Sequence, residues 1–209
     1  MMRINTITTQ ADRSGRHTVR FDDGTSMRLY RQTVEDFGLS TGMEFTEDEF
    51  LALKTAAGAM SAKMRAVRIV AATSVSKNDL QQRLVRKGED PQQAQDAVTW
   101  MENLQLLDDS KVAAQVVSKC IHKGYGIGRA KQALFEKRVP KEYWDKALEN
   151  YPVQTDAIVS FLRTRLGSNW DNRDLHKAID ALLRRGHSYS EIRIGLVQLS
   201  LEAEDFRED

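Results

Sequence analysis

The sequence has few of the residues that build disulfide frameworks, metal centres or membrane spans. It contains one cysteine and four histidines, so an internal disulfide is impossible, and the histidines make neither an H-x3-H pair nor an HExxH pattern. No apolar run approaches the roughly 20 residues that cross a bilayer, and the N-terminus lacks the apolar stretch of a secretory signal. We expect a cytoplasmic protein without membrane contact, metal or cofactor.

The single cysteine, Cys120, lies in the apolar run AAQVVSKCI. The apolar residues of this run recur at helical spacing, and unpaired cysteine is among the residue types most often buried. We therefore predict a structural thiol inside a helix rather than a nucleophile.

Strand signals are confined to the first 31 residues. The segments RHTVRF and SMRLYR alternate apolar and polar side chains, and the pair Asp23-Gly24 between them suits a tight hairpin turn. The segment MRINTIT indicates a third strand. The sequence therefore predicts a small antiparallel β segment at the N-terminus.

Two helix signals follow the strands. The segment TVEDFG predicts a short helix that ends at Gly38, and TEDE at residues 46–49 is a capping box, in which a Thr and a Glu satisfy free backbone amides. We expect the helix that begins there to end near Gly58, because glycine commonly terminates helices.

Beyond residue 60 the strand signals vanish and the sequence repeats itself. Shifts of 50 and 98 residues superimpose SVSKNDLQQRLVRKGEDP at 74–91, GYGIGRAKQALFEKRVPK at 124–141 and NRDLHKAIDALLRRGHSY at 172–189. Leu84, Leu134 and Leu182 then coincide. The segment that follows carries apolar or small residues at i, i+3, i+4 and i+7 in all three copies, which indicates one buried helical stripe per repeat.

An amphipathic run also precedes each copy, so each unit of about 50 residues holds three helices. One such unit buries too little apolar surface to stand alone and must stack on its neighbours. We predict a mainly α fold, with three tandem three-helix repeats in an elongated, curved array, preceded by the small N-terminal antiparallel β segment and a linking helix. The β segment is expected to cap the exposed end of the first repeat. The predicted segments are 1–60, 61–107, 108–152 and 153–209, the last ending in the acidic tail EAEDFRED.

Three glycines, Gly124, Gly126 and Gly128, stand close together in the second repeat, with Lys and Arg on both sides. A Walker loop requires GxxxxGK[ST] after a strand, and a dinucleotide-binding loop requires GxGxxG within a βαβ unit. This stretch has neither, and its glycines align mostly with Ser, Asn and Asp of the other repeats, residues that end and cap helices. We interpret the glycines as the boundary between two helices.

The net charge of +1 conceals a basic middle. Residues 1–60 carry 7 Lys and Arg against 9 Asp and Glu, residues 61–138 carry 14 against 8, and residues 139–209 carry 10 against 13. Each cation alone fits an ordinary solvated side chain, but together they favour nucleic-acid phosphates or an acidic protein surface as partner. The candidate binding residues are Arg83, Arg86, Lys87, Lys119, Lys123, Tyr125, Arg129, Lys131 and Lys137.

Helical geometry predicts the orientation of some of these candidates. Arg83 and Arg86 fall opposite the apolar Leu80 and Leu84, where solvent would reach them. Tyr125, between two glycines, is the aromatic residue that we expect to be exposed. It would stack on a base, fill a partner's pocket or pack against the next helix.

The motif SKNDLQQRLVRKG is followed by LLDDSKVA and then by KGYGIGRAKQAL. This order, over about residues 60 to 200, resembles the RecX family, regulatory proteins that act on the bacterial recombinase RecA. The N-terminal strands and the helix after them resemble the extra segment of longer family members. Departures occur at Thr73 and Val75, where many relatives carry arginine, and at Arg138, where the second repeat usually closes with glycine.

The resemblance implies a non-enzymatic protein that binds in the helical groove of the RecA–DNA filament and limits its assembly, ATP hydrolysis and strand exchange. It leaves open whether the protein caps filament ends, lies along the groove or speeds disassembly. We expect a monomer that contacts the RecA filament and, weakly through charge, single-stranded or double-stranded DNA.

Two other classes of protein compete with this interpretation. A helix-turn-helix DNA-binding protein is the main alternative, but the three units share a core pattern and none carries an obvious recognition helix. An enzyme would need a convergent acid and base, whereas Asp108 and Asp109 are adjacent and read as the N-terminal cap of the next helix. We therefore expect no catalysis.

Overall fold

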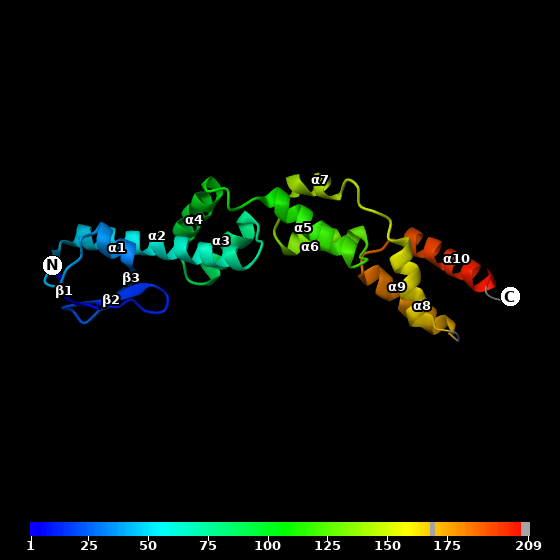
Figure 1. Cartoon of the computed structure of the whole chain (residues 1–209), viewed down its shortest axis with the longest axis horizontal. Helices are drawn as coiled ribbons and strands as arrows, with labels where there is room; N and C mark the ends of the chain where they lie inside the picture. Colours follow the sequence, from blue (N-terminus) through cyan, green and yellow to red (C-terminus); the bar gives the residue numbers. More distant parts are fainter. Residues whose placement is uncertain (168–169, 206–209) are drawn as a thin grey trace. The chain divides into compact units, whose positions relative to one another are not determined.

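The computed structural model describes residues 1–167 and 170–205 of the chain (Figure 1). The chain forms two compact units, Met1–Leu107 and Asp108–Asp209. The first contains a sheet and the first helical repeat, and the second contains the other two repeats. The fold is mainly helical with a small antiparallel sheet at the N-terminus, as the sequence predicts.

An antiparallel sheet opens the first unit. Its strands are β1 (Met2–Ile7), β2 (Arg16–Phe21), β3 (Ser26–Tyr30) and β4 (Glu44–Phe45), in the order β3-β2-β1-β4. The predicted hairpin joins β2 to β3, and Gly24 in its turn has a φ of 84°, which glycine adopts without steric strain. The sequence did not indicate β4, because a two-residue strand has no readable alternation.

The helix α1 (Arg31–Asp36) follows the sheet, and α2 (Glu47–Ala72) then runs unbroken for 26 residues. The predicted capping box is present, with the side chains of Thr46 and Glu49 each accepting the other's backbone N–H. The expected end of this helix near Gly58 is wrong. Gly58 lies inside the helix, and the Gln93 side chain fills the space that a larger residue there would need, since a Cβ on Gly58 would stand 2.3 Å from Gln93 Oε1. The predicted segment boundary after residue 60 therefore falls within α2.

The helix α2 belongs to two hydrophobic cores. Near its start, Leu53 is fully buried in the core of the sheet, and the Phe50 ring meets the Phe21 ring edge-on at 5.1 Å between centroids. In its second half, Ala62 and Ala66 are fully buried in the core of the first repeat. One continuous helix thus fixes the sheet relative to the repeat that follows.

Each repeat contributes three helical segments. The first repeat consists of α2, α3 (Lys77–Arg86) and α4 (Pro91–Asn103). The second consists of α5 (Asp109–His122), α6 (Ile127–Glu136) and the short pair η1 (Lys141–Tyr143) and α7 (Trp144–Leu148). The third consists of α8 (Thr155–Leu166), α9 (Asn172–Arg184) and α10 (Tyr189–Asp205). The helix α10 includes the start of the acidic tail, and residues 206–209 of that tail lie outside the described residues. Within the described ranges, none of the helices is long and apolar enough to span a membrane.

The periodic apolar positions form the core of each repeat, as predicted. Leu84, Leu134 and Leu182 are each fully buried, in three separate clusters. Cys120 belongs to the second cluster, and burial raises the pKa of its thiol. A buried thiol with a raised pKa is a poor nucleophile, so the predicted structural role is confirmed.

The turn after the second helix has the same geometry in all three repeats. Gly88, Arg138 and Gly186 occupy equivalent positions with φ of 91°, 52° and 85°. In each turn this residue donates its N–H to the carbonyl three residues earlier, and the next residue donates to the carbonyl five residues earlier. This is the Schellman motif. The departure at Arg138 therefore preserves the turn, with arginine in the left-handed conformation.

Candidate functional site

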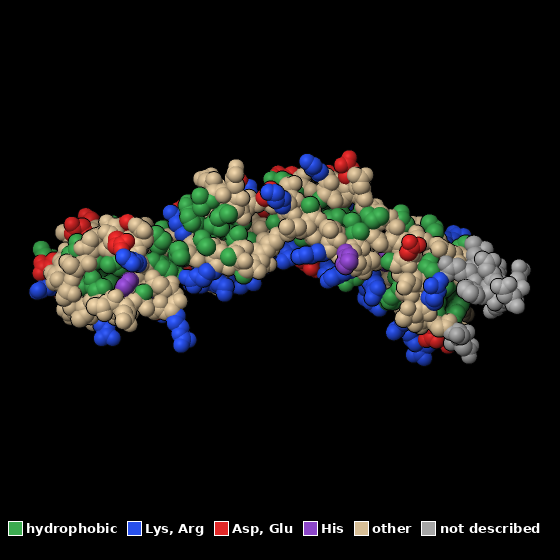
Figure 2. All heavy atoms as spheres, viewed as in Figure 1, with side chains coloured by type: hydrophobic (Ala, Val, Ile, Leu, Met, Phe, Trp, Pro, Cys, Tyr) green, Lys and Arg blue, Asp and Glu red, His purple; other side chains and the backbone are tan. Residues whose placement is uncertain are grey.

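The predicted binding residues form two groups, one in each unit. Arg83, Arg86 and Lys87 lie at the C-terminal end of α3, and Figure 2 shows Lys and Arg side chains gathered where α3 lies in Figure 1. The second unit holds the other six, on α5, on α6 and beside them: Lys119, Lys123, Tyr125, Arg129, Lys131 and Lys137.

The three cations of α3 differ in their exposure. Arg86 is exposed, as predicted, and Lys87 at the C-terminal cap of the helix is exposed as well. Arg83, for which exposure was also predicted, is half-buried: its side chain is 32% exposed, and its Nη2 lies 2.8 Å from Oδ2 of Asp79, one helical turn earlier. The Asp79 side chain is only 4% exposed, so this ion pair holds the guanidinium of Arg83 against the helix.

Two further cations reach the same surface from α2. Arg65 donates from Nη1 to the Lys87 carbonyl at 3.2 Å, and Arg65 and Arg68 line a pocket together with Arg83 and Lys87. Sequence reasoning missed both arginines. Their spacing of three residues, beside the apolar stripe of α2, places them on one face of the helix and was a usable signal.

The second unit contains a larger pocket, of about 700 Å³, between the C-terminal end of α5, the helix α8 and the end of α9. Lys123, Arg165 and Arg185 line it, and Cζ of Arg185 lies 4.3 Å from the centroid of the Phe161 ring. Cations beside an aromatic ring suit the phosphates and bases of a single strand. Of these residues the sequence singled out Lys123 alone, although the repeats align Arg185 with Lys87, a signal that was available.

The other cations of the second unit are of two kinds. Lys119 and Lys131 are exposed, whereas Lys137 is half-buried at the C-terminal cap of α6. Arg129 is also half-buried, and its guanidinium donates to both carboxylate oxygens of Glu136 at 3.0 and 3.4 Å. This pair neutralises Arg129, so Lys119, Lys123 and Lys131 carry the accessible charge of this group.

Tyr125 is not the exposed aromatic residue that the sequence indicated. It is half-buried and packs against the core of the second repeat, and its carbonyl accepts a hydrogen bond from the Tyr151 hydroxyl at 2.7 Å. Burial raises the pKa of Tyr151 to about 12, so this hydroxyl remains a donor. Packing of Tyr125 within its own repeat, close to the alternative of packing against the next helix, is thus what the structure shows.

The glycine-rich stretch lies at the boundary of two helices, as predicted, and also in a contact between repeats. Gly124 follows α5 with a φ of 63°, and Gly126 is the N-terminal cap of α6. Gly126 donates its N–H to the Arg185 carbonyl and Gly128 donates to the Gly186 carbonyl, each at 3.0 Å. The turn after α9 thus packs directly on this backbone, which explains why the second repeat has glycine where the others have larger residues.

Asp108 and Asp109 have the structural role that the sequence assigned to them. Asp108 caps α5 by accepting the Lys111 N–H at 3.0 Å, and this hydrogen bond lowers the pKa of its carboxyl group. Asp109 is buried in the first turn of the helix. Both carboxyl groups are therefore part of the start of α5.

Comparison with known proteins identifies the family. No protein-family model matches the chain. The regulatory protein RecX of Shigella sonnei is 30% identical over 111 residues, which cover 48% of this chain and 67% of that protein. The chain belongs to the RecX family. The regulatory protein RecX of Vibrio campbellii is 26% identical over 155 residues, 73% of this chain and 98% of its own length.

Solved RecX structures have the same fold. A crystal structure of regulatory protein RecX matches 92% of this chain and 98% of its own, with a TM-score of 0.63 and 21% identity. The RecX structure from Lactobacillus salivarius matches 70% of this chain and 99% of its own, with a TM-score of 0.60 and 18% identity. The sequence comparison thus confirms the family resemblance drawn from the repeat motifs, and the structural comparison confirms the fold.

Proposed function

We propose that this RecX-family protein regulates the recombinase RecA, without catalysis, by binding the RecA–DNA filament and limiting its assembly, ATP hydrolysis and strand exchange. Family membership carries the proposal, because the relatives are regulatory proteins RecX. The basic surfaces of the two units supply a physical means of contact with the filament. The protein acts in the cytoplasm, as a monomer.

Five exposed cations are the contact residues of this proposal. They are Arg86, Lys87, Lys119, Lys123 and Lys131. Their charges attract either the DNA phosphates of the filament or acidic side chains of the recombinase. Arg83 pairs with Asp79, and Arg129 pairs with Glu136. These two arginines therefore belong to the surfaces but add no uncompensated charge to them.

Contact with phosphates has a measurable signature. The slope of log affinity against log salt concentration becomes more negative by about 0.7 for each phosphate of a single strand that a cation neutralises. Contact by all five cations would give a slope of about −3.5, so affinity would fall steeply with added salt. Contact with the recombinase alone gives a shallower dependence, because fewer condensed ions are released.

The decisive experiment follows the reactions of RecA on single-stranded DNA while increasing amounts of the purified protein are added. The test variant reverses four exposed cations: Arg86→Glu, Lys87→Glu, Lys123→Glu and Lys131→Glu. The matched control reverses four exposed cations outside both groups: Arg20→Glu, Arg28→Glu, Lys141→Glu and Lys146→Glu. ATP hydrolysis and strand exchange are the two readouts, and far-UV circular dichroism checks that both variants fold.

We expect the wild type and the control variant to inhibit both reactions, and the test variant to need at least about tenfold more protein for half inhibition, from the loss of several charge contacts. Full inhibition by the folded test variant would reject the assigned surfaces. Absence of inhibition by the wild type would reject the function itself. A fixed operator selected from random DNA would instead favour the helix-turn-helix alternative.

A further inference from the structure

We infer that the pocket between the N-terminal sheet, α2 and α3 binds a phosphate group. The pocket has a volume of about 390 Å³, within the range of roughly 300–1,000 Å³ that ligand pockets occupy. Its lining comes from the sheet through Arg16 and Tyr30, from α2 through Arg65 and Arg68, and from α3 through Arg83 and Lys87. The inference gives the sheet a binding role beyond packing on the first repeat.

The charge of the lining favours an anion. Among the described residues that line the pocket, five are Arg or Lys and none is Asp or Glu. The remaining lining residues besides Tyr30 are Ile69, Ala72 and Thr73, which carry no charge. An anion entering the pocket therefore meets donors and positive charge on several sides.

Carboxylates behind the lining neutralise three of the five cations. Arg65 Nε lies 2.6 Å from Glu89 Oε1, Arg83 pairs with Asp79, and Arg16 lies 3.4 Å from Asp12. The Glu89 and Asp79 side chains are only 7% and 4% exposed, so they hold Arg65 and Arg83 in place from the protein side. Guanidinium groups that are fixed in this way bind an oxyanion with less loss of side-chain entropy.

The other two cations supply the uncompensated charge. Throughout residues 1–167 and 170–205, no carboxylate lies in an ion pair with Arg68 or Lys87. A phosphodiester carries one negative charge and free phosphate carries up to two near neutral pH. Doubly charged free phosphate would balance both charges that Arg68 and Lys87 bring to the pocket, and one diester group would balance one of them.

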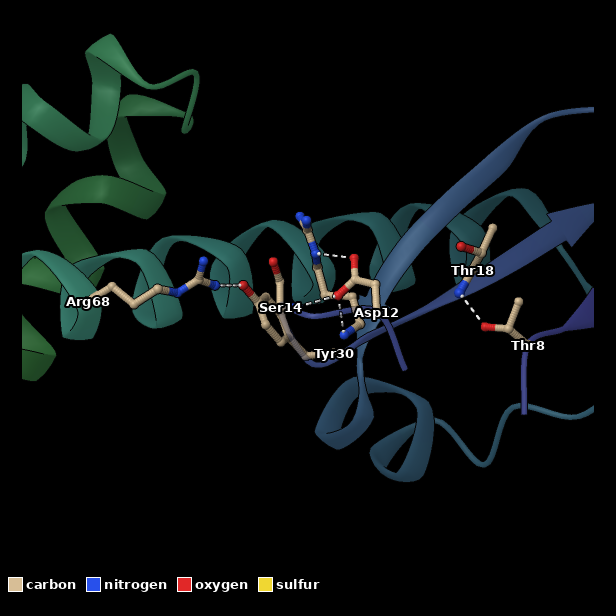
Figure 3. A network of polar contacts seen from close by, with 7 residues as sticks. Thr8, Asp12, Ser14, Thr18, Tyr30 and Arg68 are labelled. Carbon is tan, nitrogen blue, oxygen red and sulfur yellow. Dashed lines mark hydrogen bonds and ion pairs between the residues drawn. The ribbon is translucent and has the colours of Figure 1, made fainter. Parts of the chain in front are cut away.

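Tyr30 contacts two of the arginines that line the pocket. Figure 3 shows the Arg68 side chain extending from α2 to the Tyr30 hydroxyl, which accepts its hydrogen bond. Cζ of Arg16 and Cζ of Arg68 each lie 6.0 Å from the centroid of the Tyr30 ring. Because its oxygen already accepts from Arg68, the Tyr30 hydroxyl has its own proton to donate to an oxyanion.

Arg16 adds a buried donor to the pocket. Its Nε makes no hydrogen bond of normal geometry within the described part of the chain, and its nearest acceptor is Oδ2 of Asp12, 3.4 Å away in an ion pair. The loop before β2 holds this arginine in place, because Asp12 Oδ1 accepts the N–H groups of Ser14 and Arg16 at 2.8 and 3.0 Å. A buried donor with only a long contact to its acceptor is incompletely satisfied, and an anion in the pocket would offer it a second acceptor.

Two sources of the phosphate share this chemistry: a diester of single-stranded nucleic acid and free phosphate. If the ligand is a diester, the pocket contributes to the contact with the DNA of the filament, and in that case the inference rests on the proposed function. The binding experiment for this pocket contains no recombinase, so a negative result counts against the pocket alone. The ATP hydrolysis experiment tests the regulation of RecA.

The experiment titrates the full chain with a labelled oligothymidylate of about 15 nucleotides, a length that covers the usual site of a single-strand-binding domain. A second arm titrates it with inorganic phosphate at constant ionic strength and follows backbone amide signals by NMR. The variants are Arg68→Gln, Lys87→Gln and Tyr30→Phe. The matched control is Arg20→Gln, which removes an exposed cation of β2 that does not line the pocket.

We expect Arg68→Gln and Lys87→Gln each to weaken binding by about tenfold, Tyr30→Phe by about threefold, and Arg20→Gln by less than about twofold. Phosphate that moves amide signals of α2 and α3 and displaces the oligonucleotide identifies free phosphate as a ligand. Oligonucleotide binding that depends on the pocket while phosphate does not bind identifies the diester.

Either of those outcomes supports the pocket as a phosphate site. Unchanged binding of both ligands by folded Arg68→Gln and Lys87→Gln overturns the inference, as does equally tight binding of an acidic peptide. If Arg68→Gln unfolds through loss of its contact with Tyr30, the exposed Lys87→Gln decides the question alone.

Discussion

A Cβ atom on Gly126 would stand 2.1 Å from the carbonyl oxygen of Gly186, so the backbones of the second and third repeats touch with no side chain between them. Gly186 shows the same closeness from its own side, because a Cβ there would stand 2.0 Å from the backbone nitrogen of Arg129. The contact between these repeats therefore depends on glycine at both positions.

This contact predicts different results for one substitution made in two repeats. Gly88 and Gly186 are equivalent residues with left-handed φ, but a Cβ on Gly88 would meet nothing within 4 Å. We expect Gly88→Ala to lower the free energy of unfolding by about 1 kcal/mol through backbone strain alone. Gly186→Ala should cost a further 1–3 kcal/mol, roughly, because the two turns must separate. Calorimetry of both variants checks this, and equal losses would show that the close approach is not required.

His187 makes the same contact sensitive to pH. Its ring is 4% exposed, and Nε2 donates to the Gly124 carbonyl at 3.1 Å. Burial lowers the pKa of His187, an effect that nearby Arg185 adds to and that Glu191 and the bond to Gly124 oppose. Since the folded state binds the proton more weakly than the unfolded chain, stability is lost as the pH falls below about 6.5, the ordinary pKa of histidine.

We therefore expect the unfolding temperature of the wild type to fall more between pH 7 and pH 5 than that of His187→Gln. The control is His176→Gln, at an exposed residue of α9, which should keep the slope of the wild type. Parallel slopes for all three proteins would assign the acid sensitivity to carboxyl groups elsewhere.

Two ion pairs of similar length predict different contributions to stability. Arg65 lies 2.6 Å from the buried Glu89, which also accepts from the Ser61 hydroxyl at 3.0 Å, whereas Arg31 lies 2.7 Å from the exposed Glu35. Glu89→Ala should cost about 2 kcal/mol, because it leaves Arg65 and Ser61 without a shared acceptor. Glu35→Ala should change stability by less than about 0.5 kcal/mol, because solvent screens an exposed pair. Urea denaturation measures both, and similar losses would contradict the assignment of burial as the cause.

Gln105 has a φ of 57°, a left-handed conformation that glycine adopts more easily. We expect Gln105→Gly to raise the free energy of unfolding by about 0.5 kcal/mol, the relief of strain exceeding the added entropy of the unfolded chain. The same change at Gln82, an exposed residue inside α3, should lower it by about 1 kcal/mol. Changes of the same sign in the two variants would show that backbone strain at Gln105 is negligible.

The site was predicted less completely than the fold, and the reason lies in partner side chains. Arg83 and Lys87 were correctly placed near one another on α3, but the pairing of Arg83 with Asp79 depends on which rotamer the packed helix allows. Tyr30 and Arg68 are 38 positions apart in sequence, so no local pattern could indicate their contact.

The sequence by itself determined the repeat and its core. Leu84, Leu134 and Leu182 are buried because helical periodicity depends on residues three or four positions apart, which a single segment contains. The tertiary structure alone decided that α2 continues past Gly58, that Tyr125 is half-buried, and that Gly126 touches Gly186. Each of these depends on an atom brought close by the chain from far along the sequence, and a local propensity carries no information about such an atom.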